Sequence, residues 1–225
     1  MNRFFGLILA LIVLLGVGYV LAPYLRTGQT PTPVPEPSEV SVTTETVQED
    51  SEEHLIDAEY PQFGAATIDA DIKSKIETTI RDFKAIPPSP PEVLTPKNEF
   101  SASFEDVYIG PDVISLKLVF SEYTGGAHPI SIVSGLNYER ATGRQLLQSD
   151  AFAMLGLSVE EVSVQATAEL RAKLGTSMFE EGANSNPENF SSFVISEDRI
   201  TFIFQPYQVA SYAAGVQEVS FERKR

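Results

Sequence analysis

The stretch Val113-Ile-Ser-Leu-Lys-Leu-Val-Phe120, followed by Ser-Glu-Tyr-Thr-Gly-Gly-Ala-His-Pro129, decides the fold of this chain. The dense apolar run predicts a strand with a buried face. Two adjacent glycines allow backbone angles that other residues adopt only with strain. Pro129 fixes its own φ and favours an extended His128. The apolar pattern resumes over 130–138, so the sequence predicts two strands joined by a constrained loop.

This loop is the first candidate site, because it presents an aromatic ring and an imidazole from a restricted backbone. Its candidate ligand-binding or loop-organising residues are Tyr123, Gly125, Gly126, His128 and Pro129. For His128 we expect first a hydrogen bond from the ring to the loop backbone. Contact with a ligand is the second interpretation, and catalysis or metal binding the third.

Further elements surround these strands. Ile68, Ile72, Ile76, Ile80 and Phe83 recur every three or four residues, which predicts an amphipathic helix. The capping box Ser158-Val-Glu-Glu161 predicts a second helix that runs to about Leu174. Strands are expected at 100–104, 193–195, 200–204 and 216–221, and a turn at 142–143 leads into 144–147. The predicted fold is α+β, an antiparallel sheet with two or more packed helices, behind an N-terminal transmembrane helix.

The N-terminal segment is uncharged from Phe4 to Leu25, and about 20 apolar residues suffice to cross a bilayer. A cleaved signal peptide is the alternative, with Val20-Leu-Ala22 as its cleavage site. Pro23 would then follow the cut directly, which disfavours cleavage. We therefore predict that residues 1–26 are a signal-anchor helix, with the remainder extracytoplasmic, either periplasmic or extracellular.

The distribution of charge divides the rest of the chain. The formal net charge is −15, and residues 27–72 hold eleven acidic residues and no basic one. The Pro-rich start of this region predicts a disordered acidic linker over 27–58. A small helical and strand module is expected over 59–92 and an α+β domain over 93–225. The acidic balance argues against a nucleic-acid partner, and the absence of cysteine excludes disulfides.

A second constellation follows the strand that ends at Phe204, in Gln205-Pro-Tyr207-Gln-Val-Ala-Ser-Tyr212. For Tyr207 and Tyr212 we favour core packing over a binding platform. Together with the loop 123–129 and with Asn137-Tyr-Glu-x-x-Thr-Gly-Arg144, this segment resembles the RsiV-like extracytoplasmic domain family. The domain that defines this family is shared by the lysozyme-binding anti-sigma factor RsiV and the peptidoglycan deacetylase PdaC. The resemblance implies association with peptidoglycan or with a lysozyme-like protein.

The sequence departs from that family at Ile130, Gln208 and Ser211 and has no tryptophan. No Gly-x-Ser-x-Gly motif and no recognisable spacing of metal ligands is present, so we expect no catalytic residue, metal or cofactor. The expected function is a non-enzymatic, membrane-anchored binding or sensing domain of the cell envelope. A cell-wall hydrolase, which needs only two carboxylates, and a structural envelope protein acting through protein contacts are the alternatives.

Overall fold

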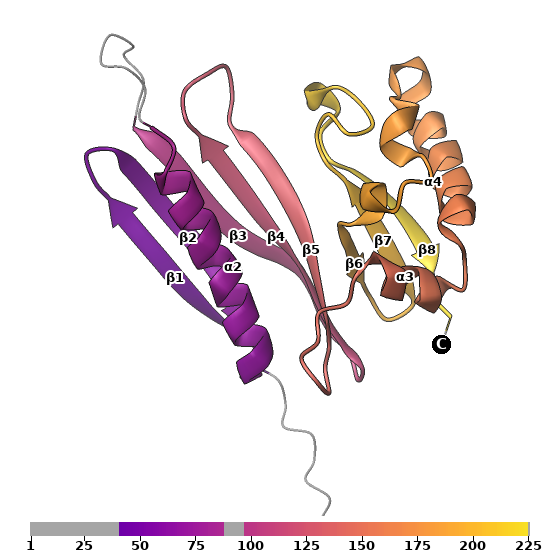
Figure 1. Cartoon of the computed structure of the whole chain (residues 1–225), viewed down its shortest axis with the longest axis horizontal. Helices are drawn as coiled ribbons and strands as arrows, with labels where there is room; N and C mark the ends of the chain where they lie inside the picture. The colour runs from indigo at the N-terminus through magenta and orange to yellow at the C-terminus, as the bar shows by residue number, and fades with distance from the viewer. Residues whose placement is uncertain (1–40, 88–96, 225) are drawn as a thin grey trace, which may run out of the picture. The chain divides into compact units, whose positions relative to one another are not determined.

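The computed structural model describes residues 41–87 and 97–224. Two sheets and three α-helices make up this part of the chain (Figure 1). The elements are strands β1 (Thr43–Asp50) and β2 (His54–Gln62), helix α2 (Ala66–Lys84), strands β3 (Asn98–Ile109), β4 (Val113–Tyr123) and β5 (Ile130–Glu139), helices α3 (Gln148–Leu155) and α4 (Val159–Leu174), and strands β6 (Phe193–Ile195), β7 (Arg199–Phe204) and β8 (Gln217–Glu222). Within these ranges no helix has the length and apolar character needed to cross a membrane. The expected anchor over 4–25 lies outside the described residues.

The first sheet has five strands in the order β1-β2-β3-β4-β5. Adjacent strands in this sheet are antiparallel, except β2 and β3, which are parallel. Two parallel strands need a crossover connection, and α2 lies in that connection. The prediction of a purely antiparallel sheet is therefore wrong, and the sheet is mixed.

Helix α2 packs on this sheet through the apolar face that its spacing predicts. Ile68, Ile72, Ile76 and Phe83 are buried, and they join a core that includes Ile56, Phe100, Leu116 and Leu118 from the strands. The charged residues between them face outward, where Lys73 and Glu77 form an ion pair. The predicted helix is thus confirmed.

The expected linker over 27–58 is wrong in its second half, because β1 and most of β2 lie there. Ile56, Ala58 and Tyr60 are buried on one face of β2, and acidic residues occupy the other. His54, which the linker would expose, is buried at the start of β2 and packs against Phe83. Because β2 pairs with β3, one sheet contains strands from both sides of the expected domain boundary between residues 92 and 93.

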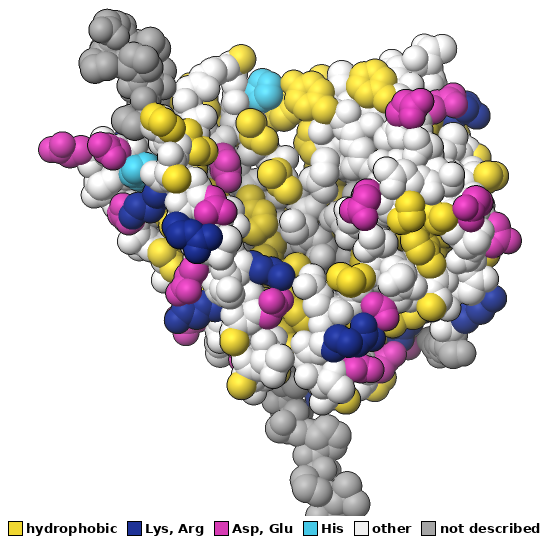
Figure 2. Space-filling view, in the orientation of Figure 1, with side chains coloured by type: hydrophobic (Ala, Val, Ile, Leu, Met, Phe, Trp, Pro, Cys, Tyr) yellow, Lys and Arg dark blue, Asp and Glu magenta, His cyan; other side chains and the backbone are white. Residues whose placement is uncertain are grey.

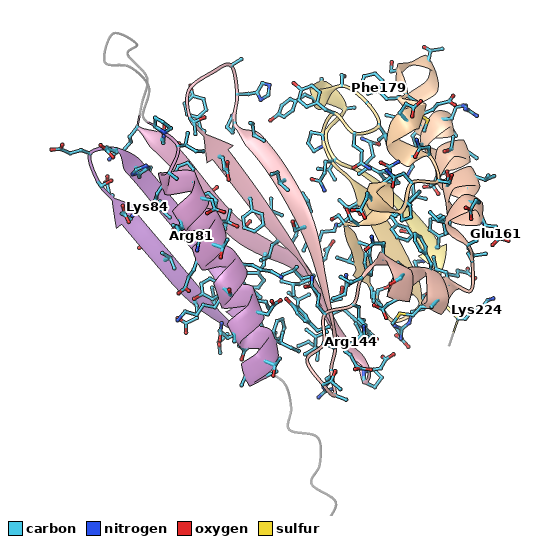
Figure 3. The ribbon with its side chains drawn as sticks, viewed as in Figure 1. Arg81, Lys84, Arg144, Glu161, Phe179 and Lys224 are labelled. Carbon is cyan, nitrogen blue, oxygen red and sulfur yellow. The ribbon has the colours of Figure 1, made fainter. Side chains whose placement is uncertain are left out.

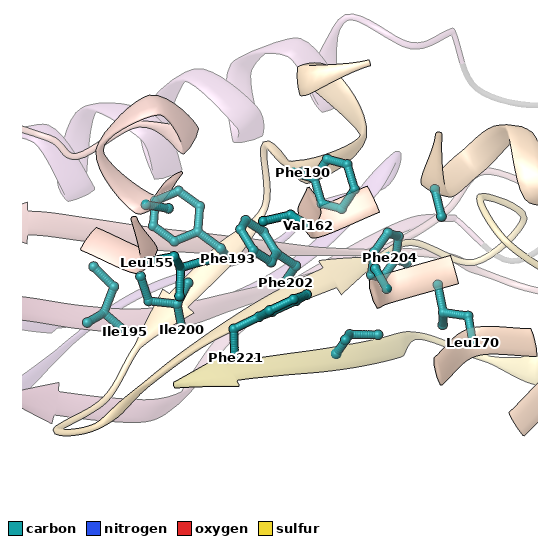
Figure 4. Packing of buried hydrophobic residues seen from close by; sticks show 14 of the residues in the cluster. Leu155, Val162, Leu170, Phe190, Phe193, Ile195, Ile200, Phe202, Phe204 and Phe221 are labelled. Atoms are coloured by element: carbon teal, nitrogen blue, oxygen red, sulfur yellow. The ribbon is translucent and has the colours of Figure 1, made fainter. Parts of the chain in front are cut away.

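The second sheet is antiparallel, in the order β6-β7-β8. The predicted hairpin is confirmed, since Ile195 pairs with Ile200 on either side of the turn. This sheet and its helices enclose a core rich in phenylalanine, in which Phe202 contacts Phe190, Phe193 and Phe221 (Figure 4). Phe202 also contacts Phe152 of α3.

Helix α4 begins as its capping box predicts. The Ser158 side chain accepts from the Glu161 N–H, and the Glu161 carboxylate accepts from the Ser158 N–H. Glu161 lies in the first turn of the helix (Figure 3). Residues 144–147, into which the predicted turn leads, form a single antiparallel bridge between Tyr138 and Gln145, and α3 follows them.

The two sheets meet where β5 and β4 pass β6. The Ser115 hydroxyl donates to Asn137 (2.7 Å), the Asn137 amide donates to the Phe193 carbonyl (2.7 Å), and the Ile195 N–H donates to Ser115 (2.8 Å). A Cβ at Gly135 would lie 1.8 Å from the Phe193 carbonyl oxygen, so only glycine allows this approach. Satisfied buried polar groups and direct backbone contact therefore fix β5 beside the second sheet.

Candidate functional site

The loop between β4 and β5 is held by its own side chains. Gly125 and Gly126 have φ values of 92° and 131°, which side-chain-bearing residues rarely adopt. The Tyr123 hydroxyl donates to the Gly126 carbonyl at 3.1 Å. His128 Nδ1 lies 2.8 Å from the Pro129 carbonyl oxygen, which can only accept, so this contact places a proton on Nδ1. The expected hydrogen bond from His128 to the loop backbone is present.

The second candidate segment meets this loop. The Tyr212 hydroxyl donates to the Pro129 carbonyl at 2.9 Å, across 83 positions of sequence. The His128 and Tyr212 rings are stacked with centroids 3.8 Å apart, and the Tyr207 ring lies 5.5 Å from that of Tyr212. We call His128, Tyr207 and Tyr212 the aromatic platform. Figure 3 shows ring side chains gathered between the loop that joins β4 to β5 and the loop that follows β7.

The platform lies on the surface. Tyr207 is 60% exposed, His128 is exposed and Tyr212 is half-buried. The preference for core packing of the two tyrosines is therefore wrong, because their rings pack on each other and on His128 instead of entering either core. Figure 2 shows this end of the molecule, where hydrophobic side chains gather beside a histidine.

Tyr207 adopts a φ of 69°, one of two positive values at non-glycine residues within the described ranges. This conformation costs roughly 1–2 kcal/mol for a residue with a side chain. Strain of this kind concentrates at functional sites.

Gln205 was not among the sequence candidates, yet it places the tyrosine segment. Its side-chain amide accepts from the Val133 N–H (2.9 Å) and donates to the Val133 carbonyl (2.7 Å). These are the two hydrogen bonds that a neighbouring strand would make to the edge of β5. The position of Gln205 directly after a strand was the only signal in the sequence, and it does not reveal a partner 72 residues away.

A groove of about 350 Å³ opens along β5 on the face that α2 covers in part. Its floor is formed by Leu118, Phe120 and Leu136. Its walls carry polar side chains from four parts of the chain, namely α2, β5, the segment around Gln145 and residues 191–192. Figure 2 shows hydrophobic side chains within a hollow near the middle of this face.

Two ionisable groups near these features have shifted pKa values. Burial raises the pKa of the Glu122 carboxyl, which shares the face of Phe120 on β4 and lies opposite Ile130. Burial alone would lower the pKa of Lys117, but hydrogen bonds to Asp106 and Glu218 outweigh it and raise the pKa. Among the described residues, no group of three or more His, Cys, Asp or Glu side chains is arranged to hold a metal ion.

The fold and this surface define an α+β module with an exposed aromatic platform. Residues 157–224 match the model of a protein family of unknown function, DUF3298, and residues 47–131 match the family described as deacetylase PdaC. The first match contains Tyr207 and Tyr212, and the second contains His128. The chain is thus similar to a domain of unknown function and to a peptidoglycan-related family.

Individual relatives agree with these matches. The chain is 27% identical over 169 residues to the peptidoglycan-N-acetylmuramic acid deacetylase PdaC of Bacillus subtilis (strain 168), which covers 73% of this chain and 36% of the relative. The chain therefore spans about a third of the length of that enzyme.

Two solved structures share the fold. One is a DUF3298 family member from Bacteroides fragilis NCTC 9343 (TM-score 0.53, 17% identity, 82% of this chain and 91% of that one). The other is a DUF3298 family protein from Pseudomonas aeruginosa PAO1 (TM-score 0.51, 15% identity, 83% and 96%).

Proposed function

We propose that this chain is a non-enzymatic binding module of the cell envelope that holds peptidoglycan through its aromatic platform. The observation that carries the proposal is the stacking of His128 on Tyr212, beside an exposed Tyr207. Sugar rings present C–H groups on one face and hydroxyls at the edge. Tyrosine offers the complement, an apolar ring with a polar tip.

The construction of the platform supports a binding role over a packing role. An exposed cluster of rings gains little from burial, while the backbone of Tyr207 bears strain. Exposed apolar side chains also continue from the platform along β5, where Ile130 is 61% and Ile132 is 45% exposed. A contiguous apolar patch of this kind marks an interaction site.

The comparisons support peptidoglycan as the ligand class, since the similar Bacillus subtilis enzyme is named for that polymer. The net charge of −15 disfavours polyanionic partners. We further propose that residues 4–25 anchor the chain in a membrane and that the module acts outside it, where peptidoglycan is found.

Co-sedimentation of the full-length chain with purified peptidoglycan sacculi tests this function. We expect the wild-type chain to be retained and Tyr212→Ala to be retained at least tenfold more weakly, because it loses the stack with His128. Tyr108→Ala, which alters a tyrosine outside the platform, is the control. Equal retention of all three proteins, or none of the wild type, would overturn the proposal. Capture of lysozyme without retention on sacculi would replace peptidoglycan by a lysozyme-like protein as the partner.

A cell-wall hydrolase is the second candidate, and Glu122 favours it. A general acid needs a raised pKa, which burial provides at this half-buried carboxyl. Release of reducing ends from sacculi by the wild-type chain, abolished in Glu122→Gln, would establish this activity. No release by the wild-type chain would remove it.

A further inference from the structure

The groove along β5 is separate from the platform, and its lining has the character of a small-molecule site. Apolar side chains form the floor and polar groups converge from α2, β5 and the segment before β6. A pocket that combines an apolar surface with a few placed polar groups is typical of small-ligand sites, and 350 Å³ falls within their usual size.

Two hydroxyls in the groove are free to bind a ligand. Within the described residues, the side chains of Ser134 and Ser191 make no hydrogen bond to the protein. Ser192, their neighbour in the wall, is committed at 2.8 Å to the Val133 carbonyl and at 3.1 Å to the Gly135 N–H. At the end of the groove the side-chain oxygen Oε1 of Gln145 accepts from Lys75 at 3.3 Å, which leaves the side-chain N–H groups of Gln145 for a ligand.

The charge of the groove favours a neutral ligand. Lys75 is its one cation among the lining residues, and its ammonium pairs with Asp71 at 3.3 Å. Asp71 also accepts from the Tyr138 hydroxyl at 2.7 Å, which holds the carboxylate in place. An anionic ligand would have to compete with this carboxylate, whereas a neutral ligand with hydroxyl and amide groups would not.

Strand β5 connects the groove to the platform. Ile130, Ile132 and Ser134 alternate along β5 and therefore share one face. Ser134 lies about 13 Å from Ile130 along the strand, and Ile130 directly follows Pro129, to which Tyr212 bonds. A linear polymer of sugars that stacks on the platform can therefore extend over Ile130 and Ile132 into the groove.

We propose that this groove is a subsite for a neutral N-acetylated hexosamine unit. The apolar floor receives the acetyl methyl and the C–H face of the ring, and Ser134, Ser191 and Gln145 bond the amide and hydroxyl groups. The inference rests on the proposed function and deepens it, since it names the sugar chemistry that is recognised and a second point of contact.

Isothermal titration of the full-length chain with tri-N-acetylchitotriose tests the subsite, with cellotriose as the sugar that lacks acetamido groups. We expect chitotriose to bind at least tenfold more tightly than cellotriose. Ser191→Trp, at an exposed position in the wall, should fill the groove and weaken chitotriose binding at least tenfold. Ser103→Trp, at an exposed position on the opposite face of the same sheet, should leave binding unchanged.

Ser191→Ala serves as a second variant, because it removes only a hydroxyl and does not risk misfolding. It should weaken chitotriose binding by roughly two- to tenfold. Equal binding of the two sugars, or full binding by both Ser191 variants, would overturn the subsite. If sacculi retain the chain but chitotriose does not bind, the subsite fails and the proposed function stands. If neither binds, both fail.

Discussion

Tyr207 concentrates the strain of the site in one residue. Its φ of 69° suits glycine, yet a large ring occupies the position and is exposed to solvent. Strain of this kind persists mainly where the surrounding structure or a function maintains it. The trade of stability for an exposed contact is common at binding sites.

This strain is measurable with two substitutions that both remove the ring. Tyr207→Gly should be more stable than Tyr207→Ala by about 1 kcal/mol, because glycine adopts positive φ without penalty. At Tyr212, which begins the 3₁₀ turn η4 (Tyr212–Ala214), the order should reverse. Urea unfolding of the four variants measures the differences, and the same order at both positions would contradict the account.

Glu122 gives a prediction about pH. Burial raises its pKa in the folded chain above the ordinary value of 4.5, so the folded chain holds this proton where the unfolded chain has released it. The free energy of unfolding therefore falls as the pH rises from about 4.5 through the raised pKa.

Glu122→Gln should remove this part of the pH dependence and be more stable than wild type at neutral pH. The measurement is the urea midpoint between pH 4 and 7. Glu99→Gln, at an exposed position on β3, should follow the wild-type curve. A Glu122→Gln curve parallel to that of wild type would show that the carboxyl is not desolvated.

Among the elements, β5 has an edge whose backbone is bonded by two side chains, Gln205 and Ser192. Gln205 accepts from the Val133 N–H and donates to the Val133 carbonyl, which Ser192 also bonds at 2.8 Å. The same side chain positions the segment that carries Tyr207 and Tyr212. It therefore couples closure of the edge to assembly of the platform.

Gln205→Ala should lower the free energy of unfolding by about 1–3 kcal/mol, because the partly buried Val133 N–H loses its partner, while the Val133 carbonyl keeps its bond from Ser192. It should also weaken retention on sacculi. Gln165→Ala, at an exposed position on α4, should change neither quantity. Thermal unfolding and co-sedimentation provide the two measurements, and a Gln205 variant as stable as the control would exclude the coupling.

The elements that sequence predicts well are those with a clear apolar period. Helix α2 and helix α4 were predicted from an isoleucine spacing and from a capping box, and β4 to β8 from apolar runs. Strands β1 and β2 were missed because acidic residues on their exposed faces gave the segment the composition of a linker. Helix α3 was not predicted, because it has only eight residues and no strong cap at Leu147.

The candidate site was predicted in its residues and not in its arrangement. The Gly-Gly loop and the two tyrosines were identified from their local chemistry. The stacking and exposure of these rings depend on contacts between distant segments, which one sequence does not reveal. The same is true of the parallel pairing of β2 with β3. The groove could not be predicted either, since its walls come from four separate parts of the chain.

At the scale of the whole described region, Lys117 joins the two sheets. Its side chain is buried, and its ammonium contacts Asp106 and Glu218 at 2.6 Å each. Asp106 belongs to β3 and Glu218 to β8. The two carboxylates are more exposed than the lysine. Loss of the carboxylates would therefore leave a buried charge, whereas loss of the lysine would leave two charges in contact with solvent.

Removal of the carboxylates should cost more than removal of the lysine. Asp106→Asn with Glu218→Gln leaves a buried charge without compensation and should lower the free energy of unfolding by about 3 kcal/mol. Lys117→Met leaves two solvated carboxylates and should cost less. Urea unfolding at neutral pH decides between them, and the reverse order would mean that Lys117 is hydrated in solution.

The proposed binding mode has sugar rings stacked on His128, Tyr207 and Tyr212. Saturation-transfer NMR between the full-length chain and soluble glycan fragments of peptidoglycan would detect this stacking. We expect strong transfer to the ring C–H protons of the sugars, largely lost when Tyr207 and Tyr212 are both replaced by alanine. Transfer confined to peptide protons, or unchanged transfer in that double variant, would contradict it.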